Sequence, residues 1–236
     1  MLSLKSVLAA ARAIVASTPS LDLLVLNAGV MMPPFSLSPD GFESQFATNH
    51  LGHQLLAREL LPSLTRGAAT APAARVVAVS SVGHWFAAPA HAMLDLAVLN
   101  DAATYDKAAW YGFSKLCNIL FAREFSRRVA RSNTGGRTVV AHAIHPGGVQ
   151  GKLLRHVGPE SVTRLFESLL YWTAPTAALT VLRPLLDPAF GAAESAGTYF
   201  VPIARVGTSS KEAQDPQLAA KLFDISDNFI DAALNA

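Results

Sequence analysis

The sequence predicts an α/β fold built on a doubly wound parallel sheet, and two observations carry this prediction. Short apolar runs rich in β-branched residues alternate along the chain with longer segments whose apolar residues recur at helical spacing. The composition is 51% hydrophobic and 15% charged, as expected when helices cover both faces of buried parallel strands. Alternating helices and strands imply a single sheet with right-handed crossovers.

The first half of the chain supplies three of these elements. A helix is expected over residues 3–17, where apolar residues follow i, i+3, i+4, i+7 spacing before Thr18-Pro19-Ser20 ends it. Residues 21–27 are apolar at nearly every position, which predicts a buried strand. A second helix is expected over residues 40–64, because apolar residues recur there in a mostly helical rhythm.

The second half continues the alternation. The β-branched run from Arg75 predicts a strand over 75–81, and the tyrosine-containing segment that follows an inserted loop predicts a helix over 109–131. The remaining expected elements are a strand over 138–144, a variable segment over 148–173, a helix over 174–187 and a strand over 197–204. All 236 residues are expected to form one domain, 1–236.

Several function classes are disfavoured by the composition. The single cysteine gives no disulfide framework, and the seven histidines lack a metal-binding spacing, so no metal site is expected. The net charge is +2, and the arginines near residues 123–131 suit the end of a helix, so no nucleic-acid partner is expected. The apolar stretch 168–182 contains Pro175 and is too short to span a bilayer.

One pair of residues points to proton transfer. Tyr111 and Lys115 lie four residues apart, so a helix projects both from the same face. An ammonium beside a phenol favours the phenolate, which would lower the pKa of Tyr111 towards the working pH. A surface pair on an amphipathic helix would have the same spacing, so the pair alone does not decide.

The ends of the predicted strands supply the context for this pair. Asn27-Ala28-Gly29 follows the first strand, Ser80-Ser81 ends the second, and Pro146-Gly147 follows the third. Ligands of open parallel sheets bind at these carboxyl ends, and small residues allow the backbone to approach a ligand closely. A ligand site is therefore expected where these turns meet the tyrosine helix.

Five motifs in this order resemble the short-chain dehydrogenase/reductase family. They are Asn27-Ala28-Gly29, Asn49-His50-Leu51-Gly52, Ser80-Ser81, Tyr111-x-x-x-Lys115 and Pro146-Gly147. The sequences around these motifs are similar to those of the retinol-dehydrogenase and WW-domain-oxidoreductase branch, which usually prefers NADP(H). The resemblance implies a Rossmann-type sheet and an oxidoreductase.

The resemblance also implies the role of each site residue. Tyr111 would be the general acid in reduction and the base in oxidation, Lys115 would assist it and hold the nicotinamide ribose, Ser81 would orient the substrate oxygen, and Asn49 would hold a relay water. The implied cofactor-binding residues are Asn27, Ala28, Gly29, Tyr111, Lys115, Pro146, Gly147 and Val149.

The sequence departs from the family at its beginning, because no Thr-Gly-x-x-x-Gly-x-Gly turn precedes Leu21. We therefore expect a sheet lacking the first βαβ units, NADP(H) binding at least 100-fold weaker than in a version extended upstream through such a turn, and a source gene that carries this segment before Met1. Without those units an apolar sheet edge would lie open to water. Two further departures are the long segment between Ser81 and Tyr111 and a glycine at position 151.

Two functions remain open from the sequence. The first is hydride transfer between NADP(H), or NAD(H), and an apolar alcohol, ketone or aldehyde. The second is a truncated pseudoenzyme without cofactor binding, acting at most as a binding protein. A serine hydrolase is disfavoured because no Gly-x-Ser-x-Gly is present. We further expect a cytoplasmic protein, compatible with association at a membrane surface, that forms a homodimer through the helices carrying Asn49 and Tyr111.

Overall fold

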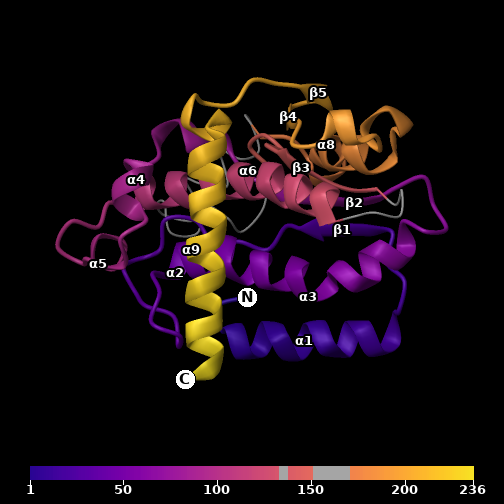
Figure 1. Ribbon diagram of the computed structural model, residues 1–236. Coiled ribbons are helices and arrows are strands. Elements are labelled where there is room, and N and C mark those ends of the chain that lie inside the picture. The colour runs from indigo at the N-terminus through magenta and orange to yellow at the C-terminus, as the bar shows by residue number, and fades with distance from the viewer. Residues whose placement is uncertain (133–137, 151–170) are drawn as a thin grey trace.

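The computed structural model describes residues 1–132, 138–150 and 171–236, which form one five-stranded sheet in the order β1-β2-β3-β4-β5 (Figure 1). The strands are β1 (Leu23–Leu26), β2 (Ala74–Val79), β3 (Val139–Ile144), β4 (Tyr199–Val201) and β5 (Arg205–Val206). The first four are mutually parallel, as their apolar, β-branched sequences predict. The expected last strand, 197–204, is instead a hairpin, because β5 turns back antiparallel to β4.

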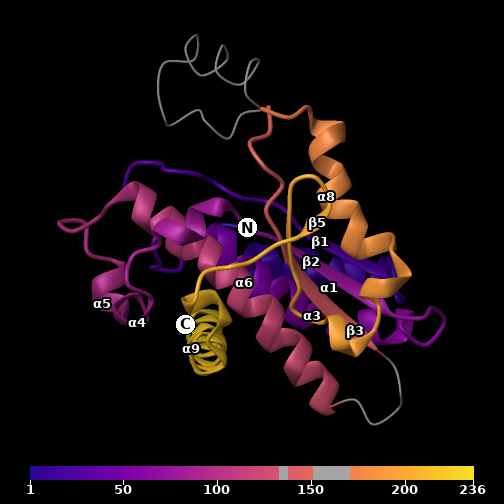
Figure 2. The same cartoon turned by 90° about the horizontal axis from the view of Figure 1, so that it is seen from above.

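Helices cover both faces of the sheet. α1 (Leu4–Ser17), α3 (Gly52–Gly67) and α6 (Lys107–Ser132) lie on one face, and α8 (Ala174–Leu186) lies on the other (Figures 1 and 2). Alternate residues of β2 therefore enter different cores, with Val76 on the side of α3 and α6 and Val77 on the side of α8. This two-sided burial confirms the predicted doubly wound arrangement.

The expected helix over 40–64 is divided into three parts. α2 (Ser44–Phe46) begins where the Glu43 carboxylate accepts hydrogen bonds from the backbone N–H groups of Gln45 and Phe46. A π-helical turn, Ala47–Leu51, follows and leads directly into α3. Single π turns inside helices occur frequently at functional sites, and this one contains Asn49.

The segment 82–108 is not an open loop. It contains a 3-10 turn (Val82–Phe86) and two short helices, α4 (Ala90–Met93) and α5 (Leu96–Leu99). The Asp95 carboxylate caps α5 by accepting from the Ala97 backbone N–H. Leu99 is fully buried, so the segment adds to the core as well as to the rim of the sheet. The prediction of a loop here is therefore wrong, because helices of four residues carry too few apolar residues to show a clear period.

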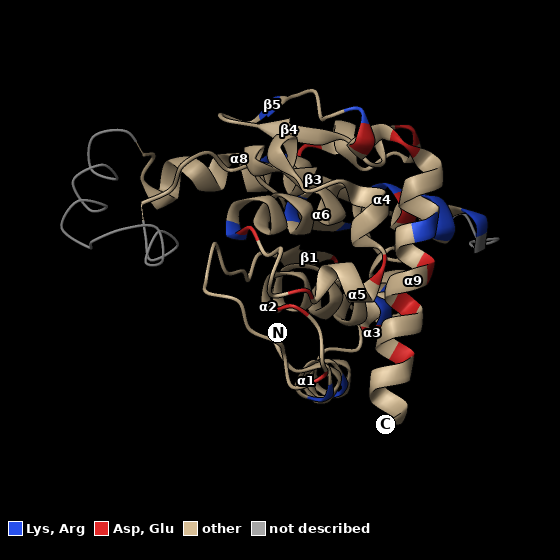
Figure 3. Cartoon of the chain, turned by 90° about the vertical axis from the view of Figure 1, so that its left-hand side faces the viewer, with Lys and Arg blue, Asp and Glu red and all other residues tan. Residues whose placement is uncertain are grey.

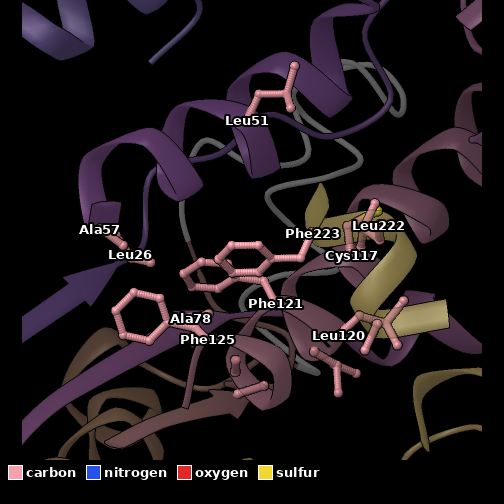
Figure 4. Packing of buried hydrophobic residues seen from close by; sticks show 14 of the residues in the cluster. Leu26, Leu51, Ala57, Ala78, Cys117, Leu120, Phe121, Phe125, Leu222 and Phe223 are labelled. Carbon is pink, nitrogen blue, oxygen red and sulfur yellow. The ribbon is translucent and has the colours of Figure 1, made fainter. Parts of the chain in front are cut away.

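The largest element missing from the sequence-based prediction is α9 (Pro216–Asn235). Its signals are local, with Asp215 capping the helix ahead of Pro216 and buried apolar residues following at helical spacing. α9 crosses α3 and α6 on their outer side (Figure 1). Phe223 stacks on Phe121 of α6 with ring centroids 6.0 Å apart (Figure 4).

Charge pairs border this apolar contact. Three aspartates spaced along α9 face basic side chains of α3 and α6, and Figure 3 shows acidic residues along α9 beside basic ones. Arg58 lies 2.8 Å from Asp231, and Arg128 lies 2.8 Å from Asp224 while its guanidinium stacks over Phe223. These pairs orient α9 on the surface that α3 and α6 present.

The position of α9 removes the reason for the expected homodimer. The helices expected to form the interface carry five apolar residues that it could use, Leu55, Leu56, Leu60, Phe121 and Phe125. In the structure Leu56 is half-buried and the other four are at most 3% exposed, packed within the same chain. Self-association through these helices stays a prediction without that support.

One of the two edges of the described sheet is β1. It pairs with β2 on one side, and Leu23 and Val25 are 40% and 41% exposed. This agrees with the expectation that an apolar edge lies open to water. Among the described residues, no helix combines the length and the apolar character that crossing a membrane requires.

Removing apolar volume from α9 should destabilise the whole domain. We expect Leu222→Ala to lower the free energy of unfolding by about 2–5 kcal/mol, because Leu222 is 1% exposed and its loss leaves a cavity between α9 and α6. Urea denaturation measures this change. The matched control is Lys221→Ala, which alters the exposed neighbouring position and should stay within about 0.5 kcal/mol of the parent. Equal stability of the two variants would contradict the role of α9.

Candidate functional site

The candidate site lies where β1, β2 and β3 end. Because these strands are parallel neighbours, the segments that follow them emerge at one edge of the sheet. The sequence places Asn27-Ala28-Gly29, Ser80-Ser81 and Pro146-Gly147 at these positions, and α6 runs alongside with Tyr111 and Lys115. The predicted site residues are therefore brought to one place.

Hydrogen bonds fix α6 against the end of β2. The Val79 carbonyl, the last of the strand, accepts from Lys115 Nζ at 3.1 Å and from Asn118 Nδ2 at 3.0 Å. The Ser80 hydroxyl donates to the Lys115 carbonyl at 2.7 Å. Each of these groups is buried, so breaking any bond would leave a desolvated polar atom. The helix is thereby held in one rotation and one register.

Tyr111 and Lys115 lie one turn apart in this fixed helix, and each is 5% exposed. Lys115 Nζ is 5.7 Å from the centre of the Tyr111 ring. Burial lowers the pKa of Lys115 to about 8. Burial also raises the pKa of Tyr111, and the nearby Tyr171 adds to this, while a hydrogen bond with Ser81 acts in the opposite direction.

The expectation that Lys115 lowers the pKa of Tyr111 is therefore wrong for this structure. The phenol is almost entirely desolvated, and desolvation opposes the charged phenolate. The lysine ammonium donates to the Val79 carbonyl and lies beside the ring of Tyr111. The neutral phenol, which is the proton donor, is the stabilised form.

Ser81, and not Ser80, faces the tyrosine. Ser81 has an extended backbone, and its Oγ accepts from the Gly83 backbone N–H at 3.0 Å. A Cβ at position 83 would lie 3.1 Å from the Tyr111 ring, so glycine permits this close approach. Ser80 is used structurally through its bond to Lys115. Ser81 is thus the serine beside Tyr111, and its role in orienting the substrate oxygen stays a prediction.

Asn49 clamps the segment after β1. Its Oδ1 accepts from the Val30 backbone N–H at 2.8 Å, and its Nδ2 donates to the Val30 carbonyl at 3.0 Å and to Ser114 Oγ at 2.9 Å. A Cβ on Gly29 would lie 3.0 Å from Asn49 Oδ1 and 3.4 Å from Lys115 Nζ. The amide therefore has a positioning role, and the relay water implied by the resemblance stays a prediction.

The turn after β3 is joined to the chain that returns from residue 171. Gly147 has a φ of +90°, which favours glycine. Val149 forms a bridge with Trp172, and the Trp172 N–H donates to the Gly148 carbonyl at 2.8 Å. Gly151 and most of the expected variable segment 148–173 lie outside the described residues.

One residue at the site has no signal in the sequence. A histidine in a loop is expected to be exposed, yet His84 is 1% exposed and its Nδ1 lies 2.7 Å from the Ser81 carbonyl. No local pattern distinguishes it, because its burial depends on the distant Ser210. His91, by contrast, is exposed.

The aromatic residues after Ser81 do not all pack inward. Trp85 and Phe86 are 53% and 73% exposed, so neither ring is buried between the inserted segment and the sheet. Trp110 is buried and its indole N–H donates to the Leu99 carbonyl at 2.9 Å. Two large apolar side chains thus stand beside the catalytic candidates.

The residues present suit one part of a dinucleotide. Gly29 lies against Asn49 and the Lys115 cation, an arrangement that fits a nicotinamide ribose, whereas Gly147 lies against Trp172 and Pro202. The glycine-rich turn that would cradle a pyrophosphate is absent from the sequence before Leu21. Across 1–132, 138–150 and 171–236, the structure holds no group of three or more potential metal ligands.

Comparison with known proteins agrees with this site. A family model described as short chain dehydrogenase matches residues 2–92. Short-chain dehydrogenase TIC 32 B, chloroplastic, of Brassica napus is 35% identical over 232 residues, covering 98% of this chain and 70% of the relative. The chain belongs to the short-chain dehydrogenase/reductase family. Human retinol dehydrogenase 12 is 38% identical over 224 residues, covering 94% of this chain and 65% of that protein.

Solved structures of the short-chain dehydrogenase/reductase fold superpose on the chain. An uncharacterised protein from Mycobacterium paratuberculosis has a TM-score of 0.66 at 28% identity, covering 98% of this chain and 73% of its own. NADPH-bound carbonyl reductase from chicken fatty liver has a TM-score of 0.59 at 20% identity, covering 88% and 74%. The predicted family and fold are confirmed, including the likeness to retinol dehydrogenases.

Lys115→Met should change how stability depends on pH. The folded-state pKa of Lys115 is about 8 and the ordinary value is 10.5, so the unfolded chain binds more protons between these values. Stability should therefore rise with pH across this range, by on the order of 3 kcal/mol, and the rise should be absent from Lys115→Met. Urea denaturation at a series of pH values measures it. The control Lys107→Met, at an exposed lysine, should keep the rise, and a parent curve parallel to that of Lys115→Met would contradict the buried ammonium.

Proposed function

We propose that the protein transfers hydride between NADP(H), or NAD(H), and an apolar alcohol, ketone or aldehyde. The observation that carries this proposal is the contact of Ser81 with Tyr111, one helical turn from the buried Lys115, at the carboxyl ends of the parallel strands. When bound, the nicotinamide supplies the hydride in reduction and accepts it in oxidation. The remaining steps belong to this chain's residues.

In reduction, negative charge develops on the carbonyl oxygen of the substrate. Ser81 Oγ would donate a hydrogen bond to that oxygen, and Tyr111 would donate its proton. The raised pKa of Tyr111 suits this direction, because it keeps the phenol protonated. In oxidation, Tyr111 would act as its phenolate, which accepts the proton of the alcohol and returns to the neutral phenol, with the Lys115 ammonium one helical turn away.

The class of substrate is inferred from the surface beside Ser81. The exposed rings of Trp85 and Phe86 would cover an apolar molecule and lose contact with water in doing so. The retinol dehydrogenases among the relatives are named for an apolar alcohol. A soluble sugar or a charged acid would gain little from this surface.

The second function, a binding protein without turnover, is the alternative. The described residues gathered at the site suit the nicotinamide end of the cofactor, and none of them forms a glycine-rich turn for the pyrophosphate. Calorimetric titration of the 236-residue protein with NADPH, followed by a turnover assay, separates the two functions. Micromolar binding with turnover supports the enzyme, whereas no binding up to millimolar NADPH supports the second function for this chain.

Tyr111→Phe is expected to lower turnover by about 100-fold or more, because it removes the proton donor. NADPH affinity should stay near that of the parent, since the ring and Lys115 remain. Steady-state kinetics and calorimetry measure the two effects. The control is Tyr105→Phe, whose hydroxyl donates to the Pro33 carbonyl away from Ser81, and it should keep its turnover. Turnover of Tyr111→Phe within threefold of the parent would remove Tyr111 from the mechanism.

A further inference from the structure

His84 joins the turn that carries Ser81 to the C-terminal part of the chain. It lies in the 3-10 turn Val82–Phe86 and is buried. Its Nδ1 lies 2.7 Å from the Ser81 carbonyl, and its Nε2 lies 3.1 Å from the backbone nitrogen of Ser210. The ring also packs edge-on against Tyr199 of β4, with centroids 5.3 Å apart. Both polar atoms of the imidazole are therefore used, each by a different segment.

The partners fix the tautomer of the ring. The Ser81 carbonyl can only accept, so Nδ1 carries the hydrogen. The Ser210 N–H can only donate, so Nε2 is the acceptor and carries none. His84 is thus neutral, and burial, which lowers its pKa, acts in the same direction. Protonation would replace the Ser210 bond with two opposed N–H groups.

The bond to Ser81 closes the turn on itself. The Ser81 carbonyl accepts from the His84 backbone N–H at 3.2 Å as well as from the ring. Within the same turn, Ser81 Oγ accepts from Gly83, which itself lies against the Tyr111 ring. The His84 ring therefore ties the turn that carries Ser81 to the backbone of Ser210. The orientation of the Ser81 hydroxyl depends on this turn.

We propose that His84 is a positioning residue for Ser81, holding the turn so that the serine hydroxyl meets Tyr111. The expected effect on turnover rests on the proposed hydride transfer, whereas the expected effect on the pKa of Tyr111 does not. Loss of the Nδ1 donor would leave the Ser81 carbonyl with the longer bond from the His84 backbone N–H and let the turn loosen. The hydrogen bond between Ser81 and Tyr111 would weaken, and because that bond lowers the pKa of Tyr111, the pKa would rise.

The groups around His84 allow a clean test. His145, at the end of β3, and Tyr199, on β4, are the titratable neighbours that the structure places against it. Burial keeps His145 neutral by lowering its pKa to about 4, and burial keeps Tyr199 neutral by raising its pKa. A change at His84 above pH 7 therefore acts on Ser81 and Tyr111 without changing these charges.

Three variants of the 236-residue protein separate the two bonds of the ring. His84→Asn can place an amide N–H where Nδ1 lies and so keep the donor to Ser81. His84→Gln can place a carbonyl oxygen where Nε2 lies and so keep the acceptor for Ser210. His84→Phe keeps the packing on Tyr199 and loses both bonds. NMR titration of carbon-13-labelled tyrosine, with Tyr111→Phe identifying the signal, follows the pKa of Tyr111 without any cofactor.

We expect the pKa of Tyr111 to stay near the parent value in His84→Asn and to rise in His84→Gln and His84→Phe. In turnover assays, kcat should fall by about tenfold or more in the latter two while KM changes little, and His84→Asn should stay within about threefold of the parent. If His84→Phe fails to fold, the comparison of His84→Asn with His84→Gln decides whether the Nδ1 donor matters. Equal titration of Tyr111 in the Asn and Gln variants would overturn the proposal.

The kinetic and structural outcomes remain separable. If the parent shows no turnover, the hydride-transfer proposal fails for this chain, and the Tyr111 titration alone decides whether His84 positions Ser81. If turnover falls equally in all three variants while the Tyr111 pKa does not move, His84 supports only the fold and the proposal is overturned.

Discussion

The attachment of α6 to the last carbonyl of β2 is the constraint on which the site depends. Lys115 and Asn118 both donate to Val79, and Ser80 returns a bond to the helix backbone. A long helix on a sheet can ordinarily rotate or slide by small amounts, but buried hydrogen bonds at one point remove both freedoms. Tyr111, one turn earlier, then has a single position relative to Ser81.

The rest of the site is built by side chains that reach across long stretches of sequence. Asn49 holds Val30 and Ser114, His84 holds Ser81 and Ser210, and α9 covers the helices from outside. None of these contacts belongs to a single element. The chemistry is local to a few atoms, whereas the geometry that permits it is distributed over most of the described chain.

This division explains how far the sequence could be used for prediction. β-branched runs predict the strands and where they end, so the proximity of Ser81 and Tyr111 could be predicted. Helices with clear apolar periods could be predicted as well. The burial of His84 and the raised pKa of Tyr111 could not, because each depends on residues distant in sequence. α9 differs from these, because its signals lie within its own sequence: Asp215-Pro216 at its start and the helical spacing of Leu218, Leu222 and Phe223.

The π-helical turn at Ala47–Leu51 places a limit on chain length at this point. The Gly52 N–H bonds to Ala47, one residue further back than in an α-helix. Deleting one residue would close an ordinary α turn and rotate everything before it by about 100° relative to α3. Asn49 could then reach Val30 only if α3 gave up its buried face. Insertions and deletions here should be tolerated less well than substitutions. The number of residues between Asn49 and Leu55 therefore constrains the site more than the identity of most residues in that interval.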